Sequence, residues 1–568
     1  MNSSVFSVSL RIGNDFYKEL QCPAGTLLMD LLRKHNIAVP TPCGGNGICG
    51  KCRVTLILQE GNFGENLNSA EVLACRYRIT GDCTVILPAG SDYFTVNFFA
   101  KDAEESSESL LYGNPSSLGA AIDIGTTTVA IQLVALYPDG SHRILKTGSF
   151  VNPQNIYGAD VISRIQNAEA GALADMSALI RSALSTELAV MTGSIRDTFA
   201  TELNSLPEGS RHTISSVVIA ANTAMTYLLL GYPCGSHGHA PFDASLTLST
   251  ITIPAGSLFF GCESAENIFV PDAEVTVFPG ISAFIGGDII SGLLKCRPPV
   301  NSLFIDLGTN GEMALTTGSG ILCTSAAAGP AFEGGNISCG VGSVEGAIAH
   351  ISFRNGIDKP LFELISTAST ALPTVTSPAA STDSTALPTV TSQMVSPKTP
   401  VGLCGTGLVD AAAGLLPEPL DETGLLAEPY FTNGVTLWKD ISGKNPGIIL
   451  TQKDIRELQL AKSAIRAGTE ILLKHAGLSC SDIGTVFLAG GFGSTLSTKS
   501  AARIGLIHNE LSKKVITVGN SALAGAVYAL SHKKEALETV TRITACCREI
   551  SLASDKDFQN YFLKYISF

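Results

Sequence analysis

The stretch LGAAIDIGTTTVAIQLVALY, residues 118–137, joins two apolar runs through a Gly-Thr turn, and an aspartate stands near the end of the first run. Apolar runs of this length around a turn signal predict two buried β-strands. The pattern returns about 180 residues later as SLFIDLGTNGEMALTT, residues 302–317. Such self-similarity indicates an internal duplication, so we predict two α/β lobes of similar design.

Each copy also has the features of an anion site. A Gly-Thr turn exposes backbone N–H groups and hydroxyls to an anion, and a strand-end carboxylate can hold Mg²⁺, usually through water. One such motif also fits a plain β-hairpin, but two facing lobes would clamp a polyphosphate. We therefore predict that Asp123 and Asp306 are the catalytic pair. They would organise Mg²⁺ and the water that attacks the polyphosphate. The predicted phosphate-binding residues are Gly125, Thr126, Thr127, Gly308, Thr309 and Asn310.

A third motif, TVFLAGGFGSTL (485–496), is an apolar strand followed by Gly490 and Gly491, a turn that lets the backbone approach a flat nucleoside closely. In this order the motifs resemble those of the actin, hexokinase and Hsp70 ATPase superfamily, whose lobes have an RNase H-like fold. The resemblance implies that Gly490 and Gly491 lie against the adenosine of ATP. It also implies two connecting helices, in FIGGDIISGLL (284–294) and TVGNSALAGAVYAL (517–530). The sequence contains neither a P-loop nor G-x-G-x-x-G after a strand.

Two further stretches are rich in glycine, at 326–348 and 402–416. They fit tight packing at the starts of helices, and they could instead shape the cleft or a partner surface. Glu333 is the one carboxylate of the first stretch that could take part in the site.

The N-terminal segment TPCGGNGICGKCRV (41–54) brings Cys43, Cys49 and Cys52 together as C-x₅-C-x₂-C, and Cys75 follows after 22 further residues. One loop with three thiolates and a distant fourth is how [2Fe-2S] ferredoxins hold their cluster. The first interval is one residue longer than in plant-type ferredoxins and resembles adrenodoxin-like variants. The glycines permit the tight turns that a loop around a cluster needs. A structural zinc site is the alternative, but such sites usually show two C-x₂-C-like pairs.

The motifs divide the chain into a ferredoxin part and an ATPase part. The strand patterns VFSVSLRIG and DFYKELQC, one helical pattern and further strands predict an α+β domain, which the resemblance to ferredoxins makes a β-grasp. The predicted fold class is this domain followed by a duplicated α/β actin-like ATPase. The predicted divisions are a [2Fe-2S] domain at 1–93, a linker at 94–117, a first lobe at 118–285 and a second lobe at 286–568 with a Ser/Thr/Pro-rich insertion at 366–400.

Composition narrows the classes of partner and compartment. The 568 residues are 45% hydrophobic and have a formal net charge of −13, which disfavours nucleic acid and anionic membranes as partners. The start of the chain lacks the pattern of a signal peptide, and Asn222 and Thr226 interrupt the apolar stretch 216–232, so we predict a cytoplasmic protein. The fifteen cysteines are therefore not expected to form disulfides, and we take Cys22 and Cys83 as non-ligands.

A [2Fe-2S] domain before an actin-like ATPase resembles the reductive activators of corrinoid-dependent methyltransferases. The stretches that carry this resemblance are NPQNIYGADVISRI (152–165), ANTAMTYLLLG (221–231), GPAFEGGNISCG (329–340), GLCGTGLVDA (402–411) and DIRELQLAKSAIRAG (454–468).

The resemblance implies an ATP-hydrolysing iron–sulfur reductase that returns inactive Co(II) corrinoid protein to Co(I). It also implies a low-potential electron donor such as a ferredoxin or flavodoxin, and it suggests a homodimer. Two alternatives are an activator of another low-potential enzyme, and a redox-sensing ATP-binding regulator that delivers no electron.

Overall fold

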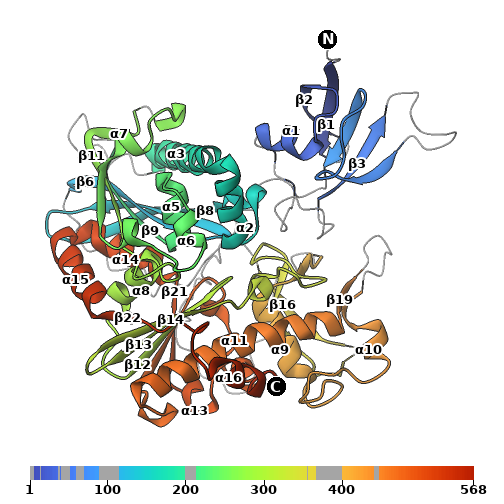
Figure 1. Cartoon of the computed structure of the whole chain (residues 1–568), viewed down its shortest axis with the longest axis vertical. Helices are drawn as coiled ribbons and strands as arrows, with labels where there is room; N and C mark the ends of the chain where they lie inside the picture. Colours follow the sequence, from blue (N-terminus) through green and yellow to red (C-terminus); the bar gives the residue numbers. More distant parts are fainter. Residues whose placement is uncertain are drawn as a thin grey trace, which may run out of the picture.

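The computed structural model in Figure 1 describes the chain without residues 1–4, 13–14, 36, 38, 40–51, 59–68, 88–113, 199–212, 266, 355, 358, 366–398 and 440–446. Cys43, Cys49, most of the predicted linker and almost all of the predicted insertion therefore lie outside the described residues.

The N-terminal domain is a five-stranded mixed sheet packed against one helix (Figure 1). The predicted hairpin and helix are confirmed, because the first two strands pair antiparallel and α1 buries Leu28 and Leu32 in the core of the domain. The last strand lies parallel to the first at the centre of the sheet, as in a β-grasp. The elements are β1 (Val5–Ile12), β2 (Asp15–Pro23), α1 (Leu28–Lys34), β3 (Arg53–Leu58), β4 (Ala70–Leu73) and β5 (Cys83–Leu87), in the sheet order β2-β1-β5-β3-β4.

The first lobe is built on a six-stranded sheet in the order β10-β11-β9-β6-β7-β8. Three consecutive strands form an antiparallel meander, and β9 and β11 extend it in parallel. The strands are β6 (Ser117–Ile124), β7 (Thr128–Leu136), β8 (His142–Val151), β9 (Ile214–Ala221), β10 (Ile251–Pro254) and β11 (Phe269–Val277). The helices of this lobe are α2 (Val161–Asn167), α3 (Leu173–Thr198), α5 (Thr223–Leu230), α6 (Gly235–Gly238) and α7 (Ala255–Leu258).

The second lobe repeats this design, which confirms the predicted duplication. Its sheet has the order β21-β20-β12-β13-β14-β22, so a meander is again extended by two parallel strands on the side of its first strand. The strands are β12 (Ser302–Leu307), β13 (Gly311–Thr317), β14 (Gly320–Ala326), β20 (Thr485–Ala489), β21 (Val515–Gly519) and β22 (Cys547–Glu549).

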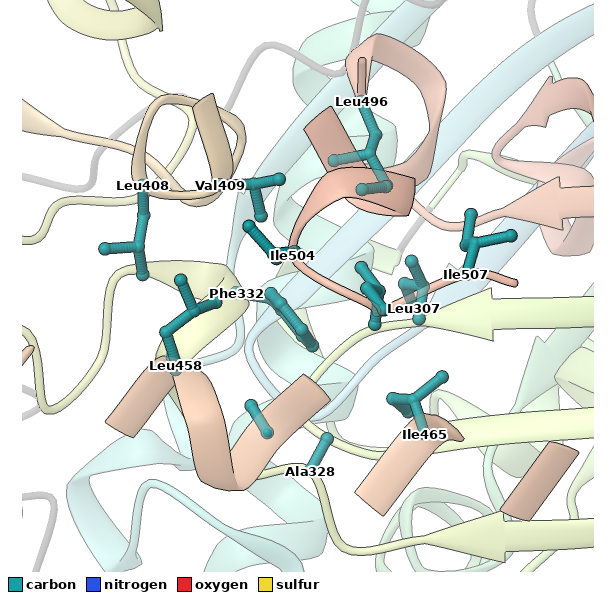
Figure 2. Close-up of a cluster of buried hydrophobic side chains, with 14 of the residues drawn as sticks. Leu307, Ala328, Phe332, Leu408, Val409, Leu458, Ile465, Leu496, Ile504 and Ile507 are labelled. Atoms are coloured by element: carbon teal, nitrogen blue, oxygen red, sulfur yellow. The ribbon is translucent and has the colours of Figure 1, made fainter. Parts of the chain in front are cut away.

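The remaining elements of this lobe enclose its main core. Figure 2 shows Phe332 among side chains that come from α9 and from α11. A capping box made by Thr451 and Asp454 fixes the start of α11. These elements are β15 (Ala347–Ser352), β16 (Leu361–Leu364), β17 (Gly402–Leu403), α9 (Gly405–Leu415), α10 (Tyr430–Asn433), β18 (Val435–Trp438), β19 (Ile448–Leu450), α11 (Gln452–Ala476), α12 (Thr498–Arg503), α13 (Asn509–Ser512) and α16 (Phe558–Lys564).

Helices α8 (Gly287–Cys296), α14 (Ser521–Ser531) and α15 (Lys533–Cys546) join the two lobes. Ile290 of α8 packs in a cluster with side chains of the first sheet, and Ile289 packs with side chains of the second sheet. α14 comes late in the chain but packs on β6 and β9. Since α8 and α14 also pack on each other, any change in the angle between the lobes must pass through this helix pair.

The apolar stretch 216–232, which Asn222 and Thr226 interrupt, forms most of β9 and the short helix α5. Among the described residues, no helix combines the length and the apolar character that crossing a membrane requires.

Candidate functional site

The two Gly-Thr hairpins face each other across the lobes. Thr127, after β6, and Thr309, after β12, bring their Oγ1 atoms to 3.4 Å. Glu333 joins them, because its Oε2 accepts a hydrogen bond of 2.9 Å from Thr127 Oγ1 and another from Thr309 Oγ1. The structure thus unites two of the three predicted phosphate-binding threonines with the one carboxylate singled out in the glycine-rich stretch.

Two buried residues of the segment 152–164 hold the backbone of the first Gly-Thr hairpin. Asn152 donates through its backbone N–H to the carbonyl of Thr127 and through Nδ2 to that of Gly125, both at 2.8 Å. Arg164 donates through Nη2 to the carbonyl of Thr126 at 2.6 Å. In a planar trans peptide the N–H points away from the carbonyl. The N–H groups of Thr126 and Thr127 are therefore turned away from this segment.

Arg164 is buried, and among the described residues its side chain forms no ion pair with a carboxylate. Its guanidinium donates instead to the carbonyls of Gly158 and Thr126 and to the Met225 sulfur. Burial lowers the pKa of Arg164 to about 9, and the charges of Asp160 and Glu333 act in the opposite direction. The side chain remains a cation at neutral pH and lies directly behind the hairpin.

Carboxylates collect at the strand ends where the lobes meet. Burial, together with the charges of Asp288, Asp123 and Glu333, raises the pKa of Asp306 to about 8. Burial likewise raises the pKa of Asp123 to about 7, against a hydrogen bond from Asn520 that lowers it. Several acidic groups that repel one another and hold protons this tightly form a site that favours a bound cation.

These carboxylates do not converge on one point. Within the part of the chain that the structure describes, no group of three acidic, histidine or cysteine side chains is arranged to hold a metal ion directly. Asp123 Oδ2 accepts a hydrogen bond of 2.7 Å from Asn520 Nδ2, which fixes the orientation of the carboxylate. A cation here would therefore be held largely through water and phosphate oxygens, the mode that Mg²⁺ prefers.

Gly490 lies against the second hairpin strand. Its φ is +90°, and a Cβ at this position would be 2.5 Å from the carbonyl oxygen of Leu307 and 2.7 Å from Asp306 Oδ1. Only glycine therefore fits beside the carboxylate without strain. Gly491 follows, and the ring of Phe492 stacks on Phe332 with centroids 4.8 Å apart. The Gly-Gly turn and the segment that carries Glu333 are thus packed together.

The N-terminal domain brings two of the four predicted cluster ligands together. Cys52 and Cys75 are both buried, and their Sγ atoms are 3.2 Å apart. Two adjacent thiols shielded from water fit shared coordination of a small metal centre. Burial raises the pKa of Cys83 to about 11, with a further contribution from Cys22, so this second pair stays protonated and suits non-ligands.

The sequence analysis did not assign several residues of this region to the site. Asp288 and Asn520 stand in the stretches assigned to the connecting helices, and Asn152 and Arg164 stand in a stretch quoted only for its resemblance. Asn222, whose Nδ2 donates to Thr126 Oγ1 at 3.0 Å, stands in another. A polar or charged residue inside an otherwise apolar, glycine-containing motif was the available signal.

Two lobes of the same topology, each presenting an Asp-x-Gly-Thr hairpin at their junction and joined by α8 and α14, define an actin- and hexokinase-like ASKHA protein, here preceded by a β-grasp domain with paired cysteines. Family models match accordingly: the 2Fe-2S iron-sulfur cluster binding domain at 14–80, the RACo middle region at 118–297, and the C-terminal domain of RACo, the ASKHA domain, at 300–568. The chain belongs to the family of RACo-type corrinoid activation proteins.

Individual relatives agree over most of the chain. The corrinoid activation enzyme RamQ of Eubacterium limosum is 26% identical, over 96% of this chain and 97% of that protein. The [Co(II) methylated amine-specific corrinoid protein] reductase of Methanosarcina barkeri is 30% identical, over 53% of this chain and 52% of that protein. A solved structure of a reductive activator for corrinoid, iron-sulfur protein is 25% identical, with a TM-score of 0.63 over 99% of this chain and 98% of that one.

Proposed function

We propose that this protein reductively activates a corrinoid protein, passing one electron to inactive Co(II) to give Co(I) while ATP is bound and hydrolysed between its lobes. The observation that supports this most directly is the union, in one chain, of a β-grasp domain with paired buried thiols and a two-lobed fold with facing Gly-Thr hairpins. A [2Fe-2S] cluster supplies a one-electron carrier of low potential when bound.

The chain's own residues have distinct parts in this proposal. Cys43, Cys49, Cys52 and Cys75 are the proposed cluster ligands, and burial of the last two keeps water from their thiolates. Asp123 and Asp306 organise Mg²⁺ through water, which requires that they lose the protons that burial makes them hold.

ATP is held by backbone and hydroxyl groups of both lobes. Thr126, Thr127, Thr309 and Asn310 hold its phosphates with Gly125 and Gly308, and Gly490 and Gly491 lie against its adenosine. Because donors come from both lobes, ATP favours the closed arrangement over any open one by the difference in its affinity for the two. Electrostatic positioning, rather than a covalent step, carries the hydrolysis.

Closure is useful because the electron transfer is uphill. Each 59 mV of unfavourable potential difference is about a tenfold loss in equilibrium for one electron. ATP can offset this by favouring the complex in which Co(II) is easier to reduce. We propose a low-potential ferredoxin or flavodoxin as the donor, a homodimer as the working unit and the cytoplasm as the compartment, where the free cysteines would stay reduced.

The test is to mix the chemically reduced protein with a Co(II) corrinoid protein and follow the Co(I) absorption band with and without Mg-ATP. We expect the band only with Mg-ATP. A band of equal size without ATP would refute the coupling. A protein that binds iron and ATP but never produces the band would be the redox-sensing regulator. A single [4Fe-4S] cluster shared between two chains, distinguished from two [2Fe-2S] clusters by its electron paramagnetic resonance spectrum, would indicate an activator of another low-potential enzyme.

A further inference from the structure

The hydroxyls proposed to hold the terminal phosphate of ATP already hold an anion in this structure. A single oxygen of the Glu333 carboxylate, Oε2, accepts from Thr127 Oγ1 in the first lobe and from Thr309 Oγ1 in the second. A phosphate oxygen has the same charge sign and the same preference for such donors. The carboxylate and the phosphate therefore compete for one place.

No fixed cation holds Glu333 there among the described residues. Glu333 takes part in no ion pair there. The charge of Arg164 acts on it from a distance, because the Arg164 guanidinium donates its hydrogen bonds to Gly158, Thr126 and Met225. Burial raises the pKa of Glu333, while the hydrogen bonds from Thr309 and Thr127 lower it. The carboxylate is thus bound by the same exchangeable groups that a nucleotide would use.

The surrounding segment can release the side chain without moving as a whole. Phe332 is buried in the second-lobe core, where it lies among side chains of α9 and α11 (Figure 2), and its ring stacks on Phe492. Gly334 follows with a φ of +77° and packs against Val341. Because both neighbours of Glu333 are anchored, displacement has to be a rotation of the Glu333 side chain out of the space between the hairpins.

We propose that Glu333 is a specificity-determining residue that occupies the place of the terminal phosphate, so that ATP displaces it and ADP leaves it where it is. The inference rests on the proposed nucleotide site. ATP brings new acceptors for Thr127 and Thr309 as it displaces the Glu333 carboxylate. Hydrogen bonds to the nucleotide then replace the hydrogen bonds through Glu333 that connect the two lobes. ADP lacks the group that reaches both hydroxyls. Glu333 therefore lowers the affinity for ATP and leaves the affinity for ADP nearly unchanged.

The experiment measures dissociation constants by isothermal titration calorimetry at pH 7 with Mg²⁺. The ligands are ADP and the non-hydrolysable β,γ-imido analogue of ATP, and the proteins are the wild type and Glu333→Gln. Glutamine has nearly the same shape but no charge, so it holds the hydroxyls more weakly. We expect the dissociation constant of the ATP analogue to fall about tenfold, a difference of about 1.4 kcal/mol, and that of ADP to change less than about twofold.

Two matched variants separate contact from charge. Glu333→Asp keeps the charge but shortens the side chain, so it loosens the contacts. The dissociation constant of the ATP analogue should again fall, but by less than in Glu333→Gln, and that of ADP should again change little. Glu312→Gln removes a buried carboxylate that makes no bond to Thr127 or Thr309 in this structure. It should change both affinities together and leave their ratio within about twofold of the wild-type ratio.

An unchanged ATP-to-ADP ratio in Glu333→Gln, or weaker binding of the ATP analogue, would overturn the inference. Loss of hydrolysis with an unchanged ratio would also overturn it, because Glu333 would then act on the attacking water. If the wild type bound neither nucleotide, the proposed ATP site itself would be refuted. If it bound both and only the ratio failed to shift, the proposed function would stand without this role for Glu333.

Discussion

Replacement of Gly525 by alanine tests whether the lobes are joined through a tightly packed helix crossing. Gly525 of α14 faces Ser291 of α8, and a Cβ there would be 2.1 Å from the Ser291 carbonyl oxygen and 2.5 Å from its Oγ. The first of these atoms belongs to the backbone and cannot rotate away. The helices must therefore separate, or α14 must shift along α8.

The change in the free energy of unfolding follows from three contributions, of which two destabilise the protein and one stabilises it. Overpacking of a well-packed contact costs about 1–3 kcal/mol. The shift also threatens the 2.6 Å hydrogen bond from Ser291 Oγ to the Ala522 carbonyl, which contributes about 1 kcal/mol. Alanine in a helix interior gains about 1 kcal/mol over glycine. The net expectation for Gly525→Ala is a loss of about 1–3 kcal/mol in the free energy of unfolding.

The matched control is Gly193→Ala. Gly193 lies in α3, and a Cβ there would meet nothing within 4 Å. The same substitution should then stabilise the protein by about 0.5–1 kcal/mol. Urea unfolding followed by circular dichroism should move the midpoint down for Gly525→Ala and up or not at all for Gly193→Ala. If Gly525→Ala were as stable as Gly193→Ala, the close crossing of α8 and α14 would be refuted.

Three further predictions concern the two proposed sites. Cys52→Ala should lose the visible absorption of the [2Fe-2S] cluster and keep ATP binding, and an unchanged spectrum would remove Cys52 from the ligands. Arg164→Met should weaken ATP binding about tenfold by calorimetry, because the hairpin loses its support at Thr126. The free energy of unfolding should fall by about 1–3 kcal/mol, because the buried carbonyls of Gly158 and Thr126 lose their donor, and unchanged ATP binding would contradict the positioning role. Without Mg²⁺ the melting temperature should fall as the pH rises from about 4 to about 8, because the raised pKa of Asp306 means that the folded state binds its proton more tightly than the unfolded state does. Asp306→Asn should flatten this fall, and a melting curve with the wild-type pH dependence would show that Asp306 has an ordinary pKa.

Local sequence patterns were sufficient to predict several of the secondary-structure elements. Apolar runs with a turn between them predicted the β6–β7 and β12–β13 hairpins, and their recurrence predicted two lobes of one topology. Alternation and helical spacing predicted the hairpin and helix of the N-terminal domain. These patterns are readable because a strand, a turn or a helix is stabilised largely by neighbours in the sequence and by one buried face.

The side chains that meet at the junction of the lobes could not be predicted from local patterns, because they come from distant parts of the chain. Thr127 and Glu333 are separated by 206 residues, and Asp123 and Asn520 by 397, yet each pair is hydrogen bonded. The sequence raised Glu333 as a carboxylate of a glycine-rich stretch, but not its position between the two hairpins. Contacts over such distances depend on how sheets and helices pack, and packing is a property of the whole core that no local pattern records.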